Sequence, residues 1–267
     1  MSVIFEGSYT LPGTDQPLTH ARIAHAGNWI SGGTITASTT ATDYFEAGPD
    51  NSLTYEKWQP TAVAATWEND LGSALELDYC CIAGHNMGTV GTTLSVEYDS
   101  TGGGSWVSVL SQAITSDMPI FAIFEPRTFQ KWRLNLTVAI PTISVIRFGS
   151  AMQMERPFYG GHAPLHMARQ TLLRSNMSES GEFLGRTKQR TFGATSMAWS
   201  NLTAAWVRAN WRPFQLATET EPFFIAWRPT TFSEVGYCQL DAVPVPENMG
   251  VRDLMSVEMG VRSLGYD

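Results

Sequence analysis

The chain has 267 residues and a formal net charge of −8, with 43% hydrophobic, 11% aromatic and only 16% charged residues. The hydrophobic fraction excludes a disordered chain, and an isoelectric point near 5.1 argues against a nucleic-acid-binding protein. Because the charged fraction is well below the ~25% of an average soluble protein, we expect partners to cover much of the surface.

The N-terminus predicts a soluble chain made in the cytoplasm. Residues 1–6 contain no basic run followed by an apolar stretch of signal-peptide length, and no segment approaches the ~20 apolar residues needed to cross a bilayer. Cys80 and Cys81 are adjacent and Cys238 is distant in sequence, so we expect all three thiols to be reduced and buried.

Residues 1–155 are predicted to form the first domain, an all-β sandwich. Apolar and polar residues alternate over 75–79, 94–99 and 132–138, and turn residues separate these runs. A strand turns successive side chains to opposite faces, so each run has one apolar and one wet face, as in antiparallel sheets packed face to face.

Residues 156–267 are predicted to form a second, β-rich domain with one or two short helices. We expect a helix within Leu165–Asn176, an exposed loop or hairpin over Gly181–Gly193, and a short helix capped by Asn201, with Pro213 beyond its end. A short buried strand is expected at Phe223–Trp227, and the alternation over Met255–Val261 predicts a C-terminal strand at a sheet edge.

Charge is divided unevenly between the two parts. Residues 1–155 carry a net charge of −9 and residues 156–267 a net charge of +1, so copies of the chain could attract each other. The segment 156–190 is locally basic, and a solvated or partner-facing loop is favoured over phosphate binding.

Several segments of the first domain resemble the galactose-binding-like, discoidin-type jelly roll. They are Leu75–Tyr79, then Leu94–Asp99 followed by a glycine-rich turn and Trp106, then Phe129–Leu134, and a closing strand within Ile143–Met154. The resemblance implies a jelly-roll sandwich over about residues 20–155. It also implies that loops at one end of the sandwich bind sugars.

The two-domain arrangement resembles tail-tip proteins of tailed bacteriophages, including distal tail and baseplate-ring proteins. The features that carry this resemblance are the jelly roll with its loop Gly84–Gly88 and an aromatic β-domain containing Glu221–Trp227. In the usual distal tail protein the ring-forming β-domain comes first, whereas here the jelly roll comes first. The resemblance therefore implies the broader class, a virion tail component assembled in the host cytoplasm.

No combination of residues predicts catalysis, a cofactor or a metal ion, and we expect a protein that is not an enzyme. His162 and His166 are separated by Pro164 and lack a third ligand, and Cys80–Cys81 lacks the spacer of a metal knuckle. The oxygen-rich loop containing Asp43, Glu46, Asp50 and Asn51 matches no EF-hand, so solvated turn residues are favoured over Ca²⁺ binding. A glycosidase carboxylate pair stays open, because sequence does not give carboxylate separations.

Two functions follow from these observations. The favoured one is a structural tail-tip component that forms a homo-oligomeric ring or docks around one, and that contacts other tail proteins. The alternative is a lectin-like module that binds a host surface glycan. The expected intersubunit contacts are Arg169, Arg174, Arg186, Lys188, Arg190, Val257, Met259 and Val261, and the candidate glycan contacts are Trp29, Tyr44 and Trp58.

Overall fold

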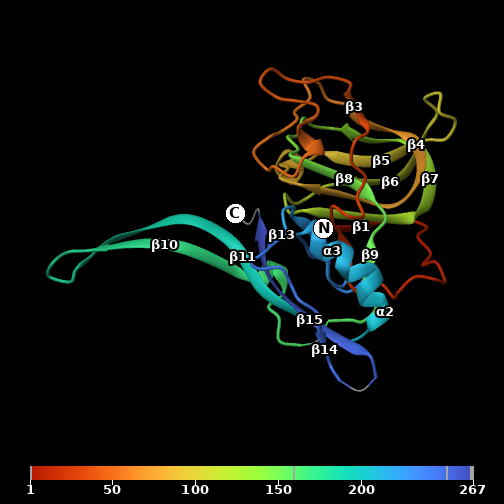
Figure 1. Cartoon of the computed structure of the whole chain (residues 1–267). Coiled ribbons are helices and arrows are strands. Elements are labelled where there is room, and N and C mark those ends of the chain that lie inside the picture. The colour runs from red at the N-terminus through yellow and green to blue at the C-terminus, as the bar shows by residue number, and fades with distance from the viewer. Residues whose placement is uncertain (1, 159, 251, 265–267) are drawn as a thin grey trace.

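The computed structural model describes residues 2–158, 160–250 and 252–264, and this part of the chain is mainly β, as predicted. Two sheets form the body, and a long two-stranded arm leaves it (Figure 1). Sheet A contains β1 (Val3–Phe5), β3 (Thr34–Ala37), β4 (Ala65–Ala83), β5 (Thr93–Asp99), β6 (Trp106–Ala113), β7 (Ile120–Thr137) and β8 (Val145–Gly149). Sheet B contains β2 (Arg22–Ala24), β9 (Met152–Gln153), β10 (Arg169–Met177), β11 (Phe183–Thr203), β12 (Phe223–Ala226), β13 (Val235–Leu240), β14 (Glu247–Asn248) and β15 (Leu254–Leu264).

Sheet A folds over on itself to make the predicted sandwich. The long strands β4 and β7 pair along nearly their whole length, residues 65–70 with 131–136 and residues 75–82 with 120–129. One half of this pair is flanked by β3 and β5, and the other half by β8 and β1. Both halves contribute side chains to one core, which includes Trp67, Leu77, Phe124, Trp132 and Leu134.

A register shift in β4 changes which side chains face this core. The sequence predicts that Leu75, Leu77 and Tyr79 share one face, but the pairing with β7 shifts between Leu77 and Tyr79. Leu77 therefore faces the sandwich interior, Tyr79 faces sheet B, and Leu75 is 39% exposed. The shift lets the second half of β4 bury both faces, because it lies between two hydrophobic cores.

Sheet B joins the two parts of the sequence. Its strand order is β10-β11-β15-β13-β12-β2-β9, with β14 paired to β15, so β2 and β9 from the first part extend a sheet made otherwise by the second. The boundary expected at residues 155 and 156 thus separates strands of one sheet.

Sheet B is buried on both faces at β12, which explains the apolar run there. Phe224 and Ala226 pack toward sheet A, while Phe223 and Ile225 pack into a third core on the other face of sheet B. The predicted strand at 223–227 is confirmed by β12. The core between the two sheets and the third core each contain residues of both parts of the sequence, whereas the sandwich core contains residues of the first part alone.

The helices of the second part lie later than predicted. The helical segment comprises α2 (Ala204–Trp206), a π-helical turn (Val207–Trp211) and α3 (Arg212–Ala217). Thr203 rather than Asn201 caps it, since the Thr203 hydroxyl accepts a hydrogen bond from the Trp206 N–H at 3.3 Å. Pro213 lies in the first turn of α3, where its missing N–H costs little. The sandwich also contains the one-turn helix α1 (Met87–Val90) and a 3-10 turn at Gly48–Asp50.

The helix predicted within Leu165–Asn176 is wrong. Only Leu165–Met167 forms a 3-10 turn, and Arg169–Met177 is strand β10. β10 pairs with β11 from Arg169↔Gly193 to Met177↔Phe183, so the expected hairpin begins earlier and is much longer than the loop at 181–193. Local helical preference fails here because pairing with β11 satisfies the backbone of the whole segment.

Cys80, Cys81 and Cys238 are free thiols and all three are buried, as predicted. Burial raises the pKa of each thiol, which keeps it protonated and unreactive. In the residues that the structure describes, every helix is too short or too polar to pass through a membrane.

Candidate functional site

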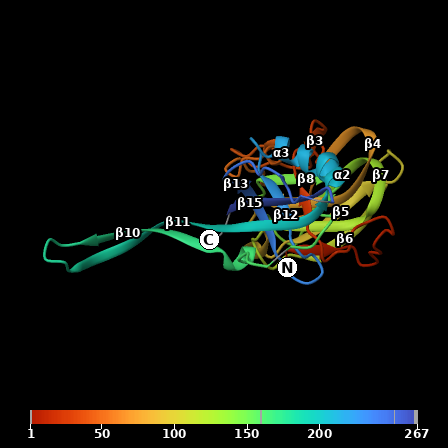
Figure 2. The same ribbon diagram turned by 60° about the horizontal axis from the view of Figure 1, so that its bottom comes forward.

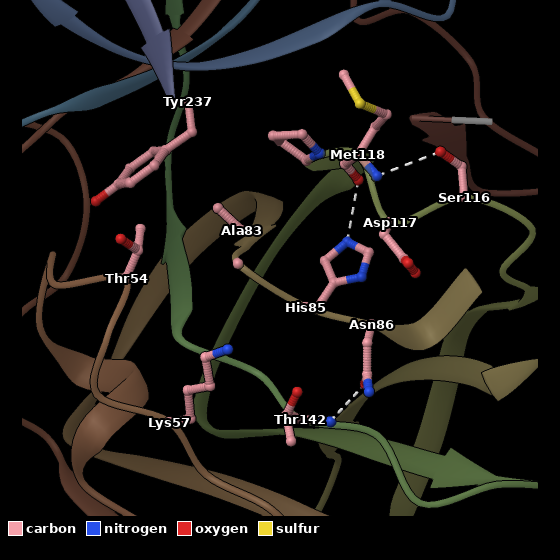
Figure 3. Close-up of a pocket in the computed structure, with 12 residues that line it drawn as sticks. Thr54, Lys57, Ala83, His85, Asn86, Ser116, Asp117, Met118, Thr142 and Tyr237 are labelled. Carbon is pink, nitrogen blue, oxygen red and sulfur yellow. Dashed lines mark hydrogen bonds between the residues drawn. The ribbon is translucent and has the colours of Figure 1, made fainter. Parts of the chain in front are cut away.

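A pocket lies at the end of the sandwich where β4 ends and β7 begins. Its volume is about 480 Å³. Thr54 and Lys57 stand on one side and His85, Asn86 and Asp117 on the other (Figure 3). Tyr237 of β13 closes the pocket from sheet B. The site therefore depends on both sheets.

Hydrogen bonds within the loops hold the wall of the pocket in place. His85 accepts a hydrogen bond from the Met87 N–H at Nδ1 and bonds through Nε2 to the Met118 carbonyl oxygen at 3.0 Å. Burial lowers the pKa of His85 to about 4, so the imidazole is neutral at pH 7. Asn86 Oδ1 accepts the Thr142 N–H at 2.7 Å, which joins two loops across the pocket.

Hydrogen bonds from Thr89 likewise hold the side chain of Asp117 in place. Its carboxylate accepts hydrogen bonds from the backbone N–H of Thr89 at 2.9 Å and from the Thr89 hydroxyl. Burial alone would raise the pKa of Asp117, but these hydrogen bonds outweigh it and lower the pKa. Asp117 is therefore ionised at neutral pH.

A second hollow, of about 810 Å³, is formed by residues 42–45 and 55–57 and is lined by aromatic side chains. Tyr44, Phe45 and Tyr55 line it, and Phe45 and Tyr55 are 64% and 74% exposed. Asp43, Glu56 and Lys57 supply polar groups at its edge. Lys57 lines both the pocket and this hollow, so the two are adjacent parts of one candidate site.

The loop that carries the aromatic side chains, residues 38–64, has no regular strand but is well anchored. The Phe45 N–H bonds to the Lys57 carbonyl oxygen at 3.2 Å, and the Trp67 Nε1–H bonds to the Glu46 carbonyl oxygen at 2.8 Å. The Tyr237 hydroxyl donates to the Ser52 carbonyl oxygen at 2.8 Å. A rigid loop presents its exposed rings without a large ordering cost when a ligand binds.

The structure places the three predicted glycan contacts differently. Tyr44 lines the hollow, as a glycan contact should. Trp58 does not qualify, because it is fully buried in the sandwich core and its Nε1–H bonds to the Thr39 carbonyl oxygen. Trp29 is half-buried, lines neither part of the site, and lies under Arg147, whose guanidinium carbon is 4.7 Å from the ring centroid.

Sequence reasoning missed Phe45, Tyr55 and Lys57. The available signal was their position, since Phe45 and Tyr55 stand among turn residues and outside any alternating run. Aromatic residues in such loops have no sheet face to pack against. Trp29 and Trp58 are aromatic residues of the same loop-rich part of the chain, but Trp58 lies in the core, where a large apolar side chain is often found.

Several of the residues considered as metal ligands contact other side chains. Asp50 forms an ion pair with Arg147 at 3.4 Å, and Asn51 bonds to Glu56. The ring centroid of His162 lies 5.0 Å from that of Phe158 and 4.7 Å from that of Trp227. Within the described residues, no three His, Cys, Asp or Glu side chains gather closely enough to hold a metal ion.

The predicted intersubunit contacts divide into two groups. Arg169, Arg174, Arg186, Lys188 and Arg190 all lie on the exposed β10–β11 hairpin. Val257, Met259 and Val261 are at most 2% exposed and pack in the third core, so they are not available for contacts. The prediction of β15 as an edge strand is also wrong, because β15 pairs with β11 on one side and β13 on the other.

No protein-family model and no curated protein matches this chain. Among solved structures, it is similar to chitosan-binding module 1 of a chitosanase/glucanase from Paenibacillus sp. IK-5, with 14% identity, a TM-score of 0.41, and coverage of 47% of this chain and 98% of that one. It is also similar to the family 32 carbohydrate-binding module of C. perfringens NanJ in complex with galactose, with 12% identity, a TM-score of 0.40, and coverage of 45% and 97%.

A third similar structure is the family 32 module of AlyQ in complex with 4,5-unsaturated mannuronic acid, with 17% identity, a TM-score of 0.38, and coverage of 43% of this chain and 92% of that chain. Each of these similarities involves less than half of the present chain.

Proposed function

We propose that this protein binds a carbohydrate at the loop end of its sandwich and is not an enzyme. The observation that supports the proposal is that a polar pocket lies next to a hollow lined by three aromatic side chains, with Lys57 lining both. Pyranose rings have an apolar face that stacks on aromatic rings and hydroxyl groups that need polar partners. The site offers both kinds of surface within one loop.

The test is binding of soluble oligosaccharides, chosen from a glycan array and measured by calorimetry. Phe45→Ala and Tyr55→Ala should each weaken binding about fivefold, because each removes a stacking surface worth about 1 kcal/mol. Phe183→Ala is the matched control, since Phe183 is 65% exposed but lies on the arm. Equal effects at all three positions, or no glycan bound by the wild type, would contradict the proposal.

A second candidate is a structural component of a phage tail tip, assembling as or around a ring and located in the virion. The β10–β11 arm favours it, because an exposed ribbon that leaves the body is suited to holding a neighbouring subunit (Figure 1). Mass spectrometry of purified virions from a lysate of the source strain tests it directly. Absence of the chain from tailed particles would remove this candidate and leave carbohydrate binding untouched.

A further inference from the structure

The arm formed by β10 and β11 stands away from the rest of the molecule. In two views separated by 60° the ribbon extends beyond both sheets (Figures 1 and 2). Among the described residues, the arm meets the body at its base, where β11 continues beside β15 from Gly193 onward and Arg262 of β15 lies 5.0 Å from the Phe192 ring centroid. Within residues 169–190, nearly every side chain is exposed or half-exposed.

An arm of this kind lacks the packing that normally stabilises a sheet. A two-stranded ribbon with both faces in water is marginally stable, because no third layer buries its side chains. This ribbon nevertheless exposes five large apolar side chains, with Met177, Phe183 and Leu184 at the tip each 65% exposed, and Leu172 and Leu173 along its length 45% and 44% exposed. Such an apolar tip is explained by a surface that covers it.

The charge of the arm indicates what kind of surface covers its tip. Residues 169–192 carry five basic side chains and two acidic ones, a net charge of +3 in a chain whose net charge is −8. The rest of the chain is therefore strongly acidic, so a second copy attracts the arm. The surface that receives the arm must therefore be acidic, to attract the basic side chains, and apolar, to cover the tip.

One groove on the body has this combination. It lies between the outer face of β11 and β15 and the loop of residues 242–247, and its volume is about 480 Å³. Val243 and Val245 line it and are 41% and 71% exposed. Glu247 and Glu258 also line it and are exposed, whereas none of the residues lining the groove is basic.

The other hollows fit the arm less well. The groove beside α3 is lined by Arg208 and Arg212, and the aromatic hollow by Lys57, so each would place a cation against the basic arm. The copy that carries the arm does not fill its own groove, because its arm extends away from the body (Figure 1).

We propose that the arm of one copy docks into the Val243–Glu258 groove of a second copy, with its basic residues facing Glu247 and Glu258. This contact is heterologous, since two different surfaces meet, and it propagates from copy to copy into a ring or a filament. It deepens the second candidate function by naming the partner and the surface, and it does not depend on carbohydrate binding.

The test uses full-length chains with reversed charges, and their mass in solution is followed by light scattering across a concentration series. The wild type should associate as concentration rises. Lys188→Glu with Arg190→Glu on the arm, or Glu247→Lys with Glu258→Lys in the groove, should weaken association by about tenfold or more. Glu76→Lys reverses an exposed charge on β4 of sheet A, outside both the arm and the groove, and should leave association unchanged.

The decisive test restores opposite charges on the two surfaces. A mixture of the arm variant and the groove variant should associate, because each variant then meets an opposite charge on the other. The chain carrying all four substitutions should associate with itself. A wild type that stays monomeric, or charge pairs that fail to restore association, would overturn the proposal. Retained glycan binding in these variants would show that the carbohydrate proposal stands separately.

Discussion

The hydroxyl of Tyr237, on β13 of sheet B, donates a hydrogen bond of 2.8 Å to the carbonyl oxygen of Ser52, in the 38–64 loop of the sandwich. Tyr237 is 1% exposed, and burial holds its pKa above the usual value, so the hydroxyl remains a donor throughout the physiological range. This bond ties the loop that carries the aromatic hollow to the second sheet.

Replacement of Tyr237 with Phe should therefore loosen the site more than it unfolds the protein. Phe keeps the ring packing against Phe224, whose centroid is 4.6 Å away, but leaves the Ser52 carbonyl oxygen without this donor. We expect a loss of about 1 kcal/mol in the free energy of unfolding. Chemical denaturation and glycan titration measure the two effects, and unchanged loop protection in hydrogen exchange would contradict the assignment.

Glu6 and Arg127 join the N-terminal strand β1 to β7. The Arg127 guanidinium donates to Glu6 at 2.9 Å, and the Glu125 N–H donates to the same carboxylate at 3.0 Å. Burial alone would raise the pKa of Glu6, but these hydrogen bonds outweigh it and lower the pKa. A lowered folded-state pKa contributes stability above the unfolded-state pKa, and that stability is lost as the pH falls through the folded-state value.

Glu6→Gln should consequently destabilise the protein at pH 7 by about 1–3 kcal/mol and by much less below pH 3. The comparison requires unfolding curves of both proteins at several pH values. A difference that does not shrink in acid would show that packing, and not charge, accounts for the loss.

Asp78 has the opposite effect on the pH dependence of stability from Glu6, because its folded-state pKa is raised and not lowered. Burial raises its pKa to about 7, despite a hydrogen bond accepted from the Ala151 N–H at 2.8 Å, and the neighbouring carboxylates of Asp15 and Glu76 add to the rise. The raised folded-state pKa means that stability is fully present below the unfolded-state pKa near 4. It is then lost as the pH rises through about 7.

Asp78→Asn should be more stable than the wild type at pH 8 by at least about 1 kcal/mol and equally stable at pH 4. The amide oxygen of Asn can still accept the Ala151 N–H, so the substitution removes the charge and preserves the bond. Thermal melts at the two pH values give the comparison, with Glu179→Gln as a control at an exposed carboxylate far from Asp78, in the turn of the arm.

Gly149 marks a close approach of three chain segments. A Cβ atom there would lie 2.2 Å from the Asn28 carbonyl oxygen and 2.8 Å from the Trp29 Cα. Gly149→Ala should therefore destabilise by about 1–3 kcal/mol, because backbone atoms must move apart. Gly7→Ala, where no atom lies within 4 Å of the added Cβ, is the control. Equal melting temperatures for the two variants would show that the strands tolerate the displacement.

The sequence by itself determined the all-β class, because alternation of apolar and polar residues over Leu94–Asp99 and Trp132–Thr137 is a local property of strands. It also located the basic residues of the arm, since charge composition needs no fold. The burial of the three cysteines followed in the same way from residue type.

Only the tertiary structure decided which aromatic side chains are exposed and which strands form edges. Trp58 and Phe45 are both aromatic and only 13 positions apart, yet one is fully buried and the other is 64% exposed. Met255–Val261 reads as a strand in sequence, but that pattern does not show that β11 pairs along one side of it while β14 and β13 pair at the two ends of the other side. Burial and edge position depend on contacts between distant segments, and the periodicity of one segment carries no information about them.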